Sequence, residues 1–96
     1  MRIATVALVV KDYDEAIGFY CDRLGFDLIA DTPLAPGKRW VLVAPAGGGA
    51  RLLLAQAGDA EETSRIGNQT GGRVGFFLET QDFAADFARF TQNGVN

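Results

Sequence analysis

The chain has 96 residues, and nine basic against twelve acidic side chains give a net charge of −3 at pH 7. That charge, with no basic cluster beyond Lys38-Arg39, argues against nucleic acid as a partner. The absence of histidine removes the commonest general base and transition-metal ligand, and the single cysteine, which allows no internal disulfide, suits the cytoplasm. No apolar run approaches the roughly 20 residues of a membrane-spanning helix, and the N-terminus becomes charged too early for a signal peptide.

The first predicted unit, residues 1–56, begins with a strand and a helix. Residues 6–10 are apolar and mostly β-branched, which predicts a strand. Asp12 and Glu15 have the spacing of a helix N-cap and its capping box, and Gly25 supplies a left-handed helix end. The buried stripe of this helix is predicted to contain Ala16, Ile17, Tyr20 and Leu24.

Three extended segments follow in the same unit. Residues 26–30 predict a strand, and residues 31–38, which contain two prolines and a glycine, predict a loop. Residues 39–44 and 51–55 then predict two strands joined by a glycine-rich hairpin connection.

A polar connector, residues 57–72, leads to a second predicted unit, residues 73–96. Asp59 and Glu62 have capping-box spacing, so the connector can carry one or two helical turns. Residues 73–80 predict a strand, and a helix follows with Asp82 as its N-cap and Gly94 as its stop.

The two units share a pattern that indicates an internal duplication. Val6, Leu8 and Val10 match Val74, Phe76 and Leu78, and Tyr13, Ile17 and Tyr20 match Phe83, Phe87 and Phe90. The second unit ends after its helix, whereas the first continues with three strands. The chain is therefore expected to be a fragment or to be completed by another protomer as a homodimer, with an intact α+β domain containing one mixed sheet as the alternative.

The strings VALVVKDYDEAIGFYCDRLGFDL and IGNQTGGRVGFFLETQDF carry a family likeness. With this order of elements, residues 1–96 resemble the glyoxalase/bleomycin-resistance/dioxygenase superfamily, also called the vicinal oxygen chelate fold. The resemblance implies a single α+β domain made of one βαβββ module and the β-α start of a second, incomplete one. Two such modules would enclose a cavity. The fold hosts enzymes and non-catalytic drug binders, so activity does not follow from it.

The resemblance also bears on cofactors. Metal-dependent members place a ligand, usually histidine, where this chain has Thr5, and another on the second module's matching strand, where it has Arg73. The fourth-strand position falls near Leu53 or Gln56. Threonine, leucine and arginine are poor or impossible ligands for a divalent transition metal, so we expect no metal and no other cofactor.

Five residues are candidates for a ligand-binding wall: Thr5, Trp40, Arg73, Phe77 and Glu79. Arg73 beside Phe77 could clamp an anionic or aromatic ligand, or it could be a surface arginine paired with Glu79. Either Trp40 or its neighbour Arg39 faces the cavity, and the sequence leaves that choice open. Val6, Leu8 and Val10 are expected to pack under the helix. Cys21 is expected to be an inert, half-buried thiol.

These observations favour a small-molecule-binding protein without the usual metal site, and they assign no catalytic residue. One alternative is a metal-dependent lyase or dioxygenase with ligands in a missing C-terminal segment. Another is a non-catalytic, oligomerising interaction domain. Whether the protein is an enzyme stays open.

Overall fold

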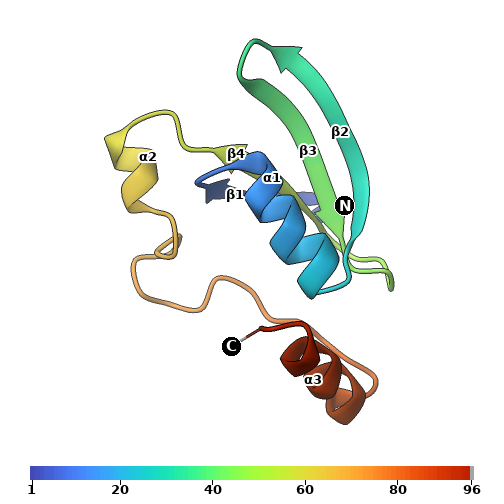
Figure 1. Cartoon of the computed structure of the whole chain (residues 1–96). Coiled ribbons are helices and arrows are strands. Elements are labelled where there is room, and N and C mark those ends of the chain that lie inside the picture. The colour runs from blue at the N-terminus through green and yellow to red at the C-terminus, as the bar shows by residue number, and fades with distance from the viewer. Residues whose placement is uncertain (96) are drawn as a thin grey trace.

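The computed structural model describes residues 1–95, so Asn96, at the end of the predicted second unit, lies outside the described residues. Its strands are β1 (Thr5–Val10), β2 (Asp27–Ala35), β3 (Lys38–Ala44) and β4 (Arg51–Gln56). They form one mixed sheet in the order β1-β4-β3-β2, with β1 parallel to β4 and the other pairs antiparallel (Figure 1). With the helix between β1 and β2, this arrangement is the predicted βαβββ module.

The helix begins as predicted and ends with an unpredicted π-helical stretch. Asp12 caps α1 (Tyr13–Ile17) by accepting a hydrogen bond from the Glu15 backbone N–H at 2.8 Å. The chain continues as the π-helical segment η1 (Gly18–Arg23), and Gly25 then leaves the helix with φ at 78°. The cap and the left-handed stop, which only glycine adopts at little cost, are confirmed.

The hydrophobic core lies between one face of the sheet and the helix. It contains Leu8, Tyr13, Ala16, Leu24, Phe26, Val41, Val43, Leu52 and Leu54, and Val10, Ile17, Tyr20 and Cys21 pack at its margin. Val41, Val43 and Leu54 are fully buried. The prediction that Val6 packs under the helix is wrong: Val6 is 42% exposed, because it lies near the start of an outer strand of the sheet.

The predicted loop over residues 31–38 is also wrong. β2 extends through this region to Ala35, and a tight turn at Pro36 and Gly37, with φ of Gly37 at 76°, leads directly into β3. Pro33 is tolerated because β2 is an outer strand, and the register between β2 and β3 shifts on either side of it.

The predicted connector and the second predicted unit each form a helix, but the second unit does not form its strand. Asp59 caps α2 (Ala60–Ser64) and Asp82 caps α3 (Phe83–Gln92), both as predicted. Within the described part of the chain, residues 73–80 form no strand and pair with none, which corrects the predicted strand there. Gln69 instead contacts the outer edge of β1. Its amide Nε2–H donates to the Val9 carbonyl (2.6 Å), and its Oε1 accepts from the Val9 N–H (3.1 Å).

α3 is joined to the first module at the end of η1. The Arg89 guanidinium donates to the Leu24 carbonyl (2.9 Å), and the Asn93 side-chain amide donates to the Arg23 carbonyl (3.0 Å). These bonds satisfy carbonyls that a helix terminus leaves without an intrahelical partner. Among residues 1–95, no helix combines the length and the apolar character needed to cross a membrane.

Candidate functional site

The two faces of the sheet are distinguished by Arg39 and Trp40. The Arg39 backbone N–H donates to the Tyr13 hydroxyl (3.2 Å), and its guanidinium lies 5.1 Å from the centre of the Tyr13 ring. Arg39 therefore faces α1. Because successive side chains of a strand point to opposite faces, Trp40 points away from α1. This settles the choice that the sequence left open.

We call the face opposite α1 the open face. Strand register places Thr5 beside Arg51, Ala7 beside Leu53, and Leu53 beside Leu42 on it. Leu42 is buried although it does not belong to the core cluster, whereas Ala7 and Arg51 are exposed. Trp40 is 42% exposed, which leaves part of its indole available for contact with another molecule.

The structure places two of the five predicted wall residues on the same face of the sheet, at opposite ends of it. Thr5 and Trp40 both lie on the open face. Arg73, Phe77 and Glu79 belong to residues 73–80, which no strand register places on that face, and Phe77 is 87% exposed. Their role in binding stays a prediction.

Arg51 is a residue that the sequence analysis did not single out. Leu52 and Leu54 belong to the core, so Arg51 and Leu53 face the opposite way. Alternation along β4 could have identified Arg51 before the structure was known. Among residues 1–95, the side-chain ion pairs involve Arg39 and Arg89 and leave Arg51 without a carboxylate partner.

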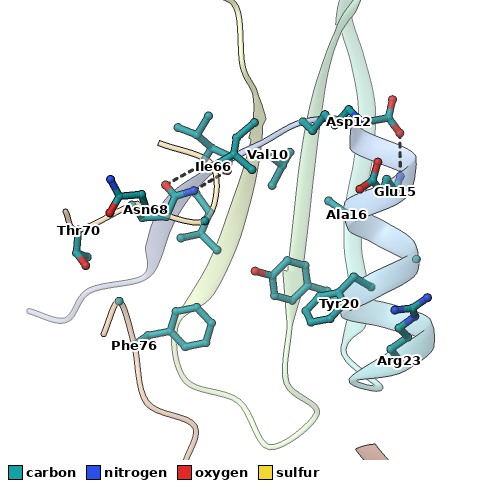
Figure 2. Close-up of a pocket in the computed structure, with 18 of the residues that line it drawn as sticks. Val10, Asp12, Glu15, Ala16, Tyr20, Arg23, Ile66, Asn68, Thr70 and Phe76 are labelled. Atoms are coloured by element: carbon teal, nitrogen blue, oxygen red, sulfur yellow. Dashed lines mark hydrogen bonds between the residues drawn. The ribbon is translucent and has the colours of Figure 1, made fainter. Parts of the chain in front are cut away.

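A separate cleft of about 910 Å³ lies between the α1–η1 helix and residues 66–76. Figure 2 shows Tyr20 and Phe76 reaching into it from different walls. Arg73 lines this cleft, whereas Thr5 and Trp40 do not. Within residues 1–95, hydrogen bonds from the 66–76 wall to β1 come from Gln69 alone. The open face rests on paired strands and is the better preorganised surface.

Cys21 borders the core and is half-buried. Burial raises the pKa of its thiol, and the nearby carboxylates of Asp22 and Asp27 raise it further. The thiolate is therefore disfavoured, as expected for an inert cysteine.

The donor set does not fit a transition metal. Thr5 and Leu53 lie on neighbouring strands of the open face, and the cation beside them, Arg51, would repel a metal ion. Within residues 1–95, no three side chains of histidine, cysteine, aspartate or glutamate converge on one point.

Arg39 links the β2–β3 hairpin to the helix through charge. Its guanidinium binds both carboxylate oxygens of Asp31 (3.0 and 2.7 Å) and one of Asp14 (2.9 Å). The hydrogen bonds from Arg39 lower the pKa of the Asp31 carboxyl below its usual value of 3.8. The ion pair of Asp31 with Arg39 thus contributes its full stability above the ordinary pKa of 3.8. This contribution is lost as the pH falls through the lower pKa that Asp31 has in the folded protein.

Arg39→Gln is expected to make the free energy of unfolding less dependent on pH. The variant should have a lower free energy of unfolding than the parent near pH 7. The difference between the two proteins should be smaller at about pH 3, because protonation of Asp31 removes the negative charge that attracts Arg39. Urea unfolding at both pH values measures this difference. Arg65→Gln, which removes an exposed charge outside the ion pairs, is the control and should leave the pH dependence unchanged. An Arg39→Gln gap that is constant with pH would contradict the assignment.

The strand–helix–three-strand order and the parallel β1–β4 pair define a βαβββ module with one face packed on its helix. The chain belongs to the glyoxalase/bleomycin resistance protein/dioxygenase superfamily, whose family model matches residues 2–96. An uncharacterized protein of Shewanella frigidimarina is 54% identical over 95 residues, which cover 97% of this chain and 70% of that protein.

Two solved structures from Streptomyces sp. CB03234 are similar to this chain. One, a glyoxalase/bleomycin resistance protein, is 34% identical with a TM-score of 0.73, over 96% of this chain and 74% of that chain. The other is TnmS3, an antibiotic binding protein, which is 34% identical with a TM-score of 0.76, over 98% of this chain and 71% of that chain.

Proposed function

We propose that this chain is a small-molecule-binding protein of the superfamily, that its ligand lies on the open face, and that it uses no metal or other cofactor there. The observation that carries the proposal is the exposed indole of Trp40 beside the apolar residues of a face that the core does not use. The similarity to an antibiotic binding protein supports the same class of function.

The lone half-buried cysteine supports a cytoplasmic location.

Trp40 makes the proposal directly testable because it is the only tryptophan of the chain. Titration of protein kept in EDTA with aromatic carboxylic acids and with bleomycin, a glycopeptide, is expected to quench Trp40 fluorescence saturably for at least one of them. By calorimetry, Trp40→Leu should weaken that binding about three- to tenfold, because a stacking partner is lost. Phe19→Leu, which truncates a partly exposed aromatic ring beside the separate cleft, is the control.

Other outcomes would favour other functions. Turnover of a hemithioacetal or a catechol that depends on added metal would favour an enzyme of the same superfamily. No response to any of these compounds, together with stable self-association, would favour an interaction domain.

We also propose that the protein is a homodimer. Val74, Phe76, Phe77 and Leu78 are exposed on the unpaired segment, and Phe83 and Phe87 of α3 are 72% and 61% exposed. The rings of Phe83 and Phe87 stack on each other with their centroids 5.8 Å apart, so they form one exposed apolar patch, which is typical of an interface. Sedimentation velocity is expected to show a dimer that Phe83→Ser together with Phe87→Ser weakens, and a parent protein that stays monomeric at high concentration would contradict the proposal.

A further inference from the structure

The open face carries a cation and an aromatic ring at opposite ends. Leu42 and Leu53 lie side by side in the middle of the sheet. Arg51 precedes Leu53 on β4 by two residues, and Trp40 precedes Leu42 on β3 by two residues. Because β3 and β4 run antiparallel, Arg51 and Trp40 lie on opposite sides of the leucine pair, separated by about 13 Å at the rise of a strand.

The surface between them is apolar and carries short side chains. Ala7 lies beside Leu53 on β1, Ala30 lies beside Leu42 on β2, and Leu42 is itself buried. A flat hydrophobic group could therefore lie against the sheet here without displacing a large side chain.

The charges around Arg51 leave it available for an anion. Its partner in register on β1 is Thr5, which is uncharged, and the next residue along β4 is the core residue Leu52. Asp27 occupies the same end of the sheet but on β2, beyond β3, and no ion pair joins it to Arg51. An arginine presents a planar set of donors that matches a carboxylate.

We propose that the ligand of the open face is an elongated aromatic anion, with its ring system against Trp40 and its carboxylate, or a similar planar anion, at Arg51. This inference rests on the proposed function and adds the chemical class of the ligand. It assigns the anion clamp to Arg51 in place of Arg73, since Arg73 lines the cleft beside α1.

The test compares two probes that differ only in the group at the end of the chain, the carboxylate of 1-pyrenebutyrate and the neutral hydroxyl of 1-pyrenebutanol. Both carry a flat ring system and a short chain, and quenching of Trp40 gives the affinity of each. The carboxylate is expected to bind about three- to tenfold more tightly than the alcohol at low salt, with the preference shrinking as salt is added. Arg51→Gln should remove the preference, because it should weaken the binding of 1-pyrenebutyrate and leave the binding of 1-pyrenebutanol unchanged.

Two variants that each remove the same unit of charge elsewhere serve as controls. Lys38→Gln acts at the β2–β3 turn and Arg73→Gln acts on the unpaired segment, and both should keep the preference for the carboxylate. Unchanged binding of the alcohol to Arg51→Gln shows that this variant is folded.

The possible failures are distinct. Equal binding of both probes to the parent, or loss of the preference in Lys38→Gln or Arg73→Gln instead of Arg51→Gln, would overturn the assignment to Arg51 while leaving small-molecule binding intact. Binding of neither probe would overturn the ligand class, and the failure of the aromatic acids and bleomycin as well would overturn the proposed function.

Discussion

Leu54→Ala is expected to lower the free energy of unfolding by about 3 kcal/mol and the melting temperature by about 15 °C. Leu54 is 0% exposed on an interior strand of the sheet and belongs to the core cluster. Truncation removes apolar contacts and leaves a cavity that neighbouring strands, fixed by backbone hydrogen bonds, cannot close. Urea denaturation followed by circular dichroism measures the loss.

Leu34→Ala is the matched control, because it is the same chemical change at a side chain that is 62% exposed. It should alter stability by less than about 0.5 kcal/mol. If both substitutions cost the same, the core is not where the structure places it.

Gly25→Ala is expected to destabilise the protein by about 2 kcal/mol or more, for two separate reasons. Gly25 has φ at 78°, and an L-residue in that conformation costs roughly 1–2 kcal/mol. A Cβ at this position would also lie 2.3 Å from Arg89 Nη1, so the end of the Arg89 side chain, which donates to the Leu24 carbonyl, would have to shift.

A double-mutant cycle separates the two causes. In the Arg89→Ala background, Gly25→Ala should cost only the backbone term, so the two effects should be less than additive. Gly47→Ala is the control, because a Cβ there meets no atom within 4 Å and the backbone does not have positive φ. Full additivity would show that Arg89 does not contact the helix end in solution.

Much of the first module could be predicted from local sequence signals. The cap at Asp12, the stop at Gly25 and the strands around Val41 and Leu54 depend on short-range chemistry and on alternation, which are visible in the sequence. The loop prediction for residues 31–38 failed because proline is excluded only from interior strands, and the sequence did not reveal that β2 lies at the edge.

The second unit shows the limit of such signals. Residues 73–80 have the composition of a strand, but a strand needs a partner edge, and in this structure Gln69 hydrogen-bonds to β1 at Val9. The helix that follows makes its backbone hydrogen bonds internally and is capped at Asp82, so it needs no partner strand, and Arg89 and Asn93 attach it to the first module.

The candidate site was predicted in part. Trp40 and Thr5 could be proposed from the sequence, but only the contact of Arg39 with Tyr13 decides which way Trp40 points. Arg51 and Arg73 each begin a segment with a strand-like sequence, but only Arg51 lies in a paired strand. Strand pairing depends on contacts between distant parts of the chain, which the sequence does not show. Division of the chain at residues 56 and 72 stays a prediction.

Nuclear magnetic resonance of the parent protein with 1-pyrenebutyrate distinguishes binding at the open face from binding in the cleft beside α1, because one spectrum reports on both surfaces. We expect the single indole N–H signal, from Trp40, and the backbone amides of Leu42 and Leu53 to shift on titration. The amides of Phe19 and Phe76, which line the cleft beside α1, should stay in place. Shifts confined to Phe19 and Phe76, with the Trp40 indole unmoved, would contradict binding at the open face.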